Sequence, residues 1–140
     1  MICFIINEAA VKKKLEYVND TISRFMDKSG IPYALQYTKY PEHATELSKD
    51  ASKKGFEKVI AVGGDGTVLE TVSGLHNSES YFGVIPMGSG NDFVKSIGMK
   101  NFNIFDALEV ICYGKVVNAV RSRFRSTGDG GYVGRDRNQF

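Results

Sequence analysis

A glycine-rich segment with one acidic residue and one threonine is the part of this 140-residue chain that best suits chemistry. Residues 63–67 read Gly-Gly-Asp-Gly-Thr and directly follow the apolar run 59–62. Glycines allow a tight turn with positive φ, and backbone N–H groups at the start of a following helix attract anions. A carboxylate beside a phosphate is repulsive unless it holds Mg²⁺ or accepts a proton. We therefore expect a phosphate site in which Asp65 is a metal ligand or a base.

Alternative interpretations of residues 63–67 stay open. The segment is a purely structural turn if Asp65 serves only as a turn residue, although this order of five residue types favours the phosphate site. Thr67 either caps the following helix or donates its hydroxyl to a phosphate. The spacing matches neither a Walker A loop, because the Gly-Lys-Ser/Thr ending is missing, nor the usual dinucleotide fingerprint.

A second glycine-rich segment follows the apolar run 81–85 and reads Pro-Met-Gly-Ser-Gly-Asn-Asp-Phe at residues 86–93. Because the carboxyl ends of parallel strands lie at one edge of a sheet, we expect both segments to face the same crevice. Ser89 would offer a hydroxyl group to a ligand there. Asn91 and Asp92 would bind the ligand or cap the next helix.

The elements that would position these segments alternate between short apolar runs and longer amphipathic ones, a pattern typical of a parallel sheet covered by helices. One helical stripe places Val18, Ile22 and Met26 at spacings of four, and Gly30 and Pro32 then end that helix. We expect strands at 2–6, 33–38, 58–62, 81–85 and 115–120, and helices at 11–28, 41–54, 68–75, 91–97 and 104–113.

Composition indicates a single folded domain, since 42% of the residues are apolar and 24% are charged. No run approaches the ~18 apolar residues of a membrane-spanning helix. The N-terminus is apolar from its first residues and has no basic lead, unlike a secretion signal. Cys3 and Cys112 each lie in an apolar run, so we expect reduced core thiols in a cytoplasmic protein.

The formal net charge of +2 is unevenly distributed. Residues 1–120 hold 12 Lys, 1 Arg and 14 acidic residues, net −1, whereas residues 121–140 hold 5 Arg and 2 acidic residues, net +3. We therefore expect a domain at 1–120 and a basic, Gly-rich tail at 121–140. The tail is interpreted as a disordered or non-native end, and the alternative is an anchor on anionic lipid. The near-neutral body gives no reason to expect nucleic acid as a partner.

The two glycine-rich segments resemble those of the diacylglycerol kinase catalytic domain, a family of bacterial diacylglycerol kinases, other lipid kinases and sphingosine kinases. Supporting matches are Thr38, Ala44 and the stretch 107–111 with Gly114. The likeness covers residues 2 to about 118, the family's nucleotide-binding half. It implies a three-layer α/β fold with a parallel sheet, of the type shared with NAD kinases, here without the family's β-rich C-terminal domain.

The resemblance implies ATP-dependent, Mg²⁺-assisted phosphorylation of a lipid hydroxyl such as that of diacylglycerol, at the inner membrane surface. It also implies a nucleotide pocket lined from several strand ends, with Asp65 as metal ligand or base. The nucleotide-binding residues would be Asn7, Thr38, Gly63, Gly64, Gly66, Thr67, Glu70, Gly88, Ser89 and Asn91.

Two departures from the family pattern affect these expectations. The first loop reads Asn-Glu-Ala-Ala-Val at residues 7–11, whereas the family has Asn-Pro followed by a small residue and glycine. We also expect no counterpart of the β-rich domain that carries the family's general base in these 140 residues, and we therefore expect the chain alone to be inactive or nearly so. Ser89 replaces the usual threonine and keeps the hydroxyl.

Three other interpretations remain beside the lipid kinase. The Gly-Gly-Asp-Gly-Thr turn also occurs in NAD kinases, which phosphorylate a dinucleotide. The altered first loop favours a non-catalytic nucleotide-binding module. An apolar face made for a further domain would favour self-association into a homo-oligomer.

Overall fold

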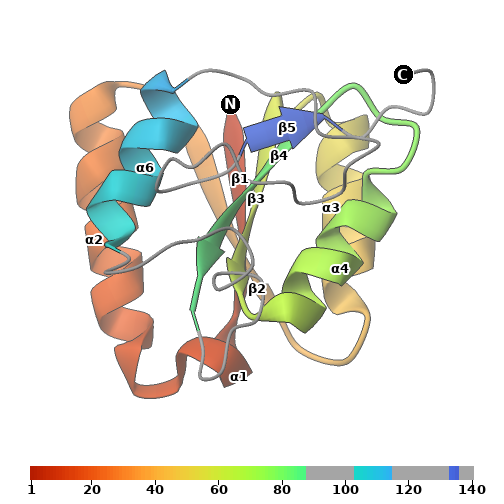
Figure 1. Cartoon of the computed structure of the whole chain (residues 1–140), viewed down its shortest axis with the longest axis horizontal. Coiled ribbons are helices and arrows are strands. Elements are labelled where there is room, and N and C mark those ends of the chain that lie inside the picture. The colour runs from red at the N-terminus through yellow and green to blue at the C-terminus, as the bar shows by residue number, and fades with distance from the viewer. Residues whose placement is uncertain (88–102, 115–132, 136–140) are drawn as a thin grey trace.

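Four parallel strands and one antiparallel strand form a single sheet with helices on both faces (Figure 1). The computed structural model describes residues 1–87, 103–114 and 133–135. The sheet order is β2-β1-β3-β4-β5, so β1, β3 and β4 each have a neighbouring strand on both sides. In chain order the elements are β1 (Ile2–Asn7), α1 (Glu8–Val11), the 3₁₀ helix η1 (Lys12–Lys14), α2 (Leu15–Ser29), β2 (Tyr33–Thr38), α3 (His43–Lys53), β3 (Lys58–Gly63), α4 (Asp65–Gly74), β4 (Tyr81–Pro86), α6 (Ile104–Tyr113) and β5 (Val133–Arg135).

The helices form two layers, with α2 and α6 on one face of the sheet and α3 and α4 on the other (Figure 1). Side chains alternate between these faces along each strand, as the two-residue period of a strand requires. In β1, Phe4 and Ile6 pack into the core under α2 and α6, whereas Cys3 and Ile5 pack into the core under α3 and α4. The sequence prediction of a three-layer α/β fold with a parallel sheet is confirmed.

Both cores are filled mainly by aliphatic side chains, which explains the continuous apolar runs of the inner strands. The core under α2 and α6 contains Val18, Ile22 and Met26, the stripe that the helical spacing predicted. The core under α3 and α4 is built from smaller side chains and includes Ala44 and Ala51.

The predicted helix at 11–28 is divided in the structure. Residues Glu8–Val11 form α1, and η1 separates it from α2 because Lys12 adopts a positive φ of 49°. The end of α2 agrees with the sequence prediction: Gly30 follows it in the left-handed conformation with φ 75°.

Helices α3 and α4 begin at other residues than predicted. Glu42 lies outside α3 with a φ of 68°, so α3 begins at His43 instead of residue 41. Helix α4 begins at Asp65 instead of residue 68, so the glycine-rich segment itself contributes the first turn of α4.

A three-residue strand in the C-terminal segment joins the sheet. In β5, Val133 pairs with Gly83 and Arg135 pairs with Tyr81, antiparallel to β4. Three residues of the segment that we expected to lie outside the fold are therefore part of the sheet, because they pair with an edge of β4. The boundary at residue 120 stays a prediction, and the helix predicted at 91–97 and the strand at 115–120 lie outside the described residues.

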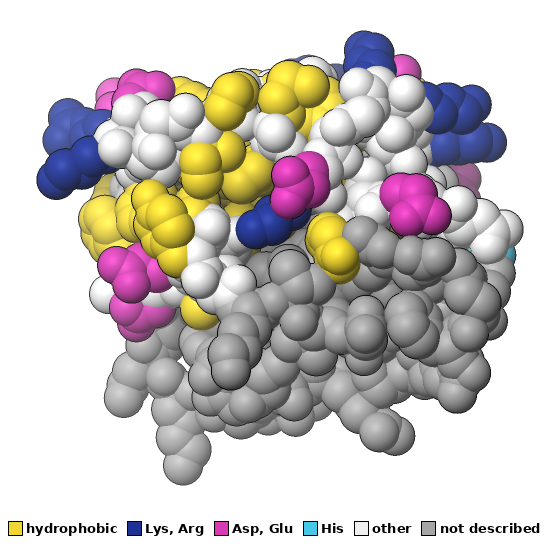
Figure 2. Space-filling view, turned by 90° about the horizontal axis from the view of Figure 1, so that it is seen from above, with side chains coloured by type: hydrophobic (Ala, Val, Ile, Leu, Met, Phe, Trp, Pro, Cys, Tyr) yellow, Lys and Arg dark blue, Asp and Glu magenta, His cyan; other side chains and the backbone are white. Residues whose placement is uncertain are grey.

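The edge of the sheet where the strands begin carries hydrophobic side chains over the ends of α2 and α6 (Figure 2). At these helix ends the rings of Phe25 and Tyr113 lie 6.5 Å apart, and Tyr113 is 66% exposed. Self-association through such a surface stays a prediction. None of the helices in the described part of the chain has the length and apolar character that a membrane span needs.

Candidate functional site

The carboxyl ends of the strands place three of the predicted site residues at one edge of the sheet, near α1 in Figure 1. Asn7 ends β1, Thr38 ends β2 and Gly63 ends β3. Asn7 pairs with Thr38 in the parallel register of β1 and β2. Thr38 and Gly63 are 31 and 56 positions after Asn7 in the chain, and the order of the strands brings all three to this edge.

The side chain of Asn7 makes contacts in two directions. Its Oδ1 accepts hydrogen bonds from the backbone N–H groups of Ala9 at 3.0 Å and Ala10 at 3.4 Å, which caps α1. Its Nδ2 donates to Oγ1 of Thr67 at 2.9 Å. A carboxamide is needed for this, since it carries an acceptor and a donor on one group. Asn7 therefore fixes the junction of β1 and α1 against the first turn of α4.

Gly63 lies directly beneath this hydrogen bond. A Cβ atom at residue 63 would lie 2.6 Å from Oγ1 of Thr67 and 3.2 Å from Cβ of Asn7. Glycine is needed here because the two side chains occupy the space that a methyl group would take.

The prediction of positive φ angles in the turn at residues 63–67 is wrong. Among the described glycines only Gly30 and Gly55 have positive φ, whereas Gly64 has a φ of −95°. Gly63 serves close approach, whereas a Cβ atom at Gly64 or Gly66 would meet no protein atom nearer than 3.8 Å.

Gly64 is the N-cap residue of α4, and its carbonyl accepts the first helical hydrogen bond from the N–H of Val68 at 3.1 Å. The N–H groups of the first helical turn have no partner four residues earlier, so this end of α4 can receive an anion. Gly66 is exposed there, and a Cβ atom at residue 66 would meet nothing within 4 Å. The turn therefore leaves open space in front of the first turn of α4.

Thr67 does not cap α4, one of the two roles left open for it. It lies in the first turn, 3% exposed, and its hydroxyl oxygen accepts the bond from Asn7. This bond does not use the hydroxyl proton of Thr67, so the hydroxyl can still donate a hydrogen bond.

Asp65 is the first residue of α4 and is half-buried. A carboxylate in the first turn of a helix interacts favourably with the helix dipole, so Asp65 also stabilises α4. In residues 1–87, 103–114 and 133–135, no three acidic, histidine or cysteine side chains gather that would hold a metal ion by themselves. A cation at Asp65 would need further ligands from the nucleotide and water.

Two residues that the sequence prediction did not place in the site, Glu8 and Lys39, form an ion pair at this edge, with Nζ of Lys39 3.0 Å from Oε1 of Glu8. The backbone N–H of Lys39 also donates to Nδ1 of His43 at 2.8 Å. The ion pair joins the first residue of α1 to the loop after β2, beside Asn7 and the half-buried Thr38. A signal was available, since Glu8 and Lys39 each directly follow a predicted site residue.

The remaining predicted residues are placed as follows. Glu70 is half-buried on the second turn of α4, and its backbone carbonyl accepts a hydrogen bond from Oγ1 of Thr45 at 2.9 Å, which ties α4 to α3. Gly88, Ser89 and Asn91 lie outside the described residues.

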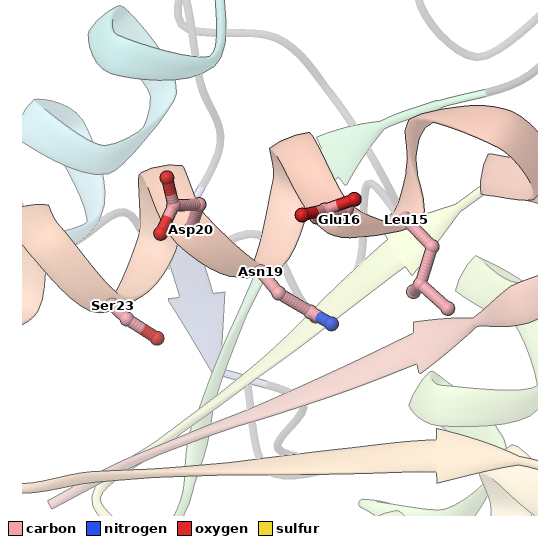
Figure 3. Close-up of a pocket in the computed structure, with 5 residues that line it drawn as sticks. All are labelled: Leu15, Glu16, Asn19, Asp20 and Ser23. Atoms are coloured by element: carbon pink, nitrogen blue, oxygen red, sulfur yellow. The ribbon is translucent and has the colours of Figure 1, made fainter.

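A pocket of about 340 Å³ runs along α2 and contains none of the predicted site residues (Figure 3). Among the described residues, the side chains that line it come from this helix, and Asn19 accepts a hydrogen bond from the hydroxyl of Tyr37 at 3.0 Å. The lining residues are Leu15, Glu16, Asn19, Asp20 and Ser23.

The two cysteines are packing residues, as the sequence predicted. Both are free thiols. Burial raises the pKa of Cys3 to about 12, with a smaller contribution from the charge of Asp50. Burial also raises the pKa of Cys112, whose Sγ lies 3.6 Å from Sδ of Met26. Neutral thiols of this kind are poor nucleophiles and metal ligands.

Comparison with known proteins identifies relatives over much of the chain. Residues 1–121 match the family model described as the diacylglycerol kinase catalytic domain. The chain is 33% identical over 90 residues to a diacylglycerol kinase of Bacillus subtilis, and 37% identical over 94 residues to one of Staphylococcus carnosus. The crystal structure of a diacylglycerol kinase from Bacillus anthracis superposes with a TM-score of 0.69 at 26% identity.

The matched region is only part of these relatives. It covers 63% of this chain and 30% of the Bacillus subtilis protein, and 66% of this chain and 30% of the Staphylococcus carnosus protein. The superposition covers 81% of this chain and 43% of the Bacillus anthracis chain. The chain therefore spans less than half the length of the relatives that it matches.

Proposed function

This chain belongs to the family of the diacylglycerol kinase catalytic domain, and on that premise we propose that it is the nucleotide-binding part of an ATP-dependent lipid kinase. The reaction would transfer the terminal phosphoryl group of ATP to a hydroxyl group of a lipid such as diacylglycerol. The observation that carries the proposal is the hydrogen bond from Asn7 to Thr67, which fixes the first turn of α4 beside open space at Gly66.

The first turn of α4 would hold the phosphates of ATP. Its backbone N–H groups and the positive end of the helix dipole would stabilise phosphate oxygens. Phosphoryl transfer depends mainly on positioning and on electrostatic stabilisation, so a rigid turn of this kind is suited to it. Gly64 and Gly66 would admit the phosphates close to the backbone, and Gly63 would keep Thr67 and Asn7 in place.

Asp65 would contribute the carboxylate that a magnesium ion needs from this half of the protein. Mg²⁺ in nucleotide sites is usually held by one or two carboxylates together with phosphate oxygens and water. A single half-buried carboxylate at the phosphate turn fits that mode. When bound, the ion would neutralise phosphate charge. Without it, the carboxylate of Asp65 would repel the phosphates.

The ends of β1 and β2 would form the neighbouring wall of the ATP site. Asn7 and Thr38 pair in register there, and both are half-buried. Glu70, on the next turn of α4 after Thr67, would stand behind the phosphate turn. Ser89, Gly88 and Asn91 are proposed as nucleotide ligands from the second glycine-rich segment.

Lipid phosphorylation would belong to the whole protein, at the inner surface of the cytoplasmic membrane. The chain matches about a third of the length of its relatives, so its 140 residues supply only the corresponding part of the machinery. We therefore expect the 140-residue chain to bind ATP and to phosphorylate lipid slowly or not at all. Rapid phosphorylation of diacylglycerol vesicles by this chain would contradict that expectation.

Calorimetric titration with ATP and Mg²⁺ tests the proposed site most directly. Gly66→Ala adds a methyl group to the open space without touching the protein, so ATP binding should weaken by tenfold or more. Thermal stability should stay the same or rise, because alanine is the better helix former by about 1 kcal/mol. Ser73→Ala, on an exposed position of the same helix, is the matched control and should leave ATP binding unchanged. Equal ATP affinity in all three chains would contradict the proposal.

A non-catalytic nucleotide-binding module is the second candidate, and the altered segment after β1 favours it. This segment begins α1 at Glu8 and lacks the proline and glycine that the resemblance implies for a phosphate loop. ATP binding without any turnover by the full-length protein in the presence of lipid would establish this alternative.

A further inference from the structure

The ion pair between Glu8 and Lys39 is not used by the proposed function. We infer that it positions the two chain segments that directly follow Asn7 and Thr38, and so sets the affinity of the site for nucleotide. This inference rests on the proposed nucleotide site. Neither residue is proposed to touch the nucleotide: both are positioning residues.

The ion pair spans the two strand ends. Asn7 and Thr38 are register partners at the end of β1 and β2, so the residues that follow them emerge side by side. Nζ of Lys39 reaches Oε1 of Glu8 at 3.0 Å. The contact therefore joins the first residue after β2 to the first residue of α1, where no backbone pairing between the strands continues.

Each partner of the pair belongs to a backbone that is fixed by a second contact. Glu8 begins α1, which Asn7 caps through the N–H groups of Ala9 and Ala10. The N–H of Lys39 donates to Nδ1 of His43 at 2.8 Å, and this anchors the loop to the first residue of α3. Both partners of the ion pair therefore lie in short segments that hydrogen bonds hold in place.

The lysine side chain is also supported from the other side. Its Nζ lies 5.7 Å from the centre of the Tyr37 ring, and the hydroxyl of Tyr37 donates to Oδ1 of Asn19 on α2. A cation near an aromatic ring is stabilised by the charge distribution of that ring. Lys39 is thus restricted to a region next to Glu8, even though its side chain is 60% exposed.

The expected size of the effect follows from the exposure of the pair. Exposed ion pairs contribute about 0.2–1 kcal/mol, which corresponds to a factor of up to about five in a dissociation constant. Loss of the pair would let the segments after β1 and β2 move apart, so the side chains of Asn7 and Thr38 at these strand ends would be held less firmly for the nucleotide.

Four variants test the inference by calorimetric titration with ATP and Mg²⁺. Glu8→Gln and Lys39→Met should each raise the Kd about two- to fivefold. The exchanged pair, Glu8→Lys with Lys39→Glu, should return the Kd to within about twofold of the original chain, because it restores the tether. Asp50→Asn is the control. It removes a comparable exposed ion pair at the C-terminal end of α3, in which Nζ of Lys54 lies 2.9 Å from Oδ2 of Asp50, and it should leave the Kd unchanged.

Three results would overturn the inference. Tighter binding in Glu8→Gln would show that the carboxylate acts by repelling phosphate. A failure of the exchanged pair to restore affinity, after both single variants have weakened it, would show that Lys39 contacts the nucleotide itself. Unchanged affinity in both single variants would show that the pair has no role in binding.

Hydrogen exchange without nucleotide separates this inference from the proposed function. In Glu8→Gln the amides of Ala9, Ala10 and Lys39 should exchange about two- to fivefold faster than in the original chain, while amides of β3 stay protected. Unchanged exchange at these three amides would contradict the inference even if ATP binds. Faster exchange in a chain that does not bind ATP would instead contradict the proposed function alone.

Discussion

Nδ2 of Asn7, at the end of β1, donates a hydrogen bond to Oγ1 of Thr67 in the first turn of α4 at 2.9 Å. The two residues are 60 positions apart in the chain. Their bond fixes the distance between the junction of β1 and α1 and the glycine-rich turn, and it lies over Gly63.

Thr67→Val should lower both stability and ATP affinity. Valine has the shape of threonine but no hydroxyl, so Nδ2 of Asn7 loses its acceptor, which costs about 1–2 kcal/mol in the free energy of unfolding. Denaturant unfolding and ATP titration measure the two effects. Thr67→Ser keeps the oxygen and should retain most of the ATP affinity. Wild-type stability and affinity in Thr67→Val would show that the bond is unimportant.

Gly63→Ala should destabilise the chain by about 1–3 kcal/mol, because the new methyl group would overlap Oγ1 of Thr67 and force it away from Asn7. Thermal unfolding measures this loss. Gly66→Ala is the matched control on the same turn, since its methyl group meets nothing and should cost no stability. Equal melting temperatures in the two variants would mean that close approach does not explain Gly63.

Gly74→Ala should weaken the packing of α4 on α3. A Cβ atom at residue 74 would lie 2.3 Å from the backbone carbonyl of Thr45 and 1.9 Å from Oγ of Ser48. The serine side chain can rotate away, but the carbonyl moves only with its helix, so we expect a loss of about 1–3 kcal/mol. Urea unfolding measures it. ATP affinity measured well below the melting temperature should change much less than in Gly66→Ala.

The thiol of Cys3 should make stability fall with rising pH above about 9. Burial raises its pKa in the folded chain to about 12, from an ordinary value near 9. The unfolded chain therefore releases the proton first, so the folded state loses stability between these two values and keeps it fully below pH 9. Denaturant unfolding at pH 8 and at pH 10 measures the loss.

Cys3→Ala is the control for this pH dependence. Removing the sulfur lowers stability at every pH because it leaves a small cavity in the core. The decrease between pH 8 and pH 10 should nevertheless be smaller than in the original chain. An identical decrease in both chains would assign the pH dependence to other groups.

Local sequence patterns were sufficient to predict most of the helices and strands. The strand at Tyr33–Thr38 and the helix at Ile104–Tyr113 have the predicted bounds, because apolar runs and a helical stripe are local consequences of burial. The first helix was predicted too long because Lys12 adopts a left-handed φ, for which no glycine or asparagine gave a signal.

The residues of the site were predicted from the sequence, but the contacts between their side chains were not. Positions of Asn7, Thr38 and Gly63 at strand ends followed from the sequence, whereas the reason for Gly63 did not. The sequence indicated positive φ, and the structure shows a glycine that makes room for the side chains of Asn7 and Thr67. Glu8 was noted only as a departure from the family pattern, because its partner Lys39 lies 31 residues away.

The sequence by itself determined that this chain folds into strands buried on both faces and amphipathic helices, with a glycine-rich turn between strand and helix. These properties depend on neighbours within a few residues, where spacing and burial are read directly. Only the tertiary structure decided that Asn7 meets Thr67, that Glu8 meets Lys39 and that β5 pairs with β4. Such contacts depend on strand order and register, which join distant segments and leave no periodic pattern in either segment alone.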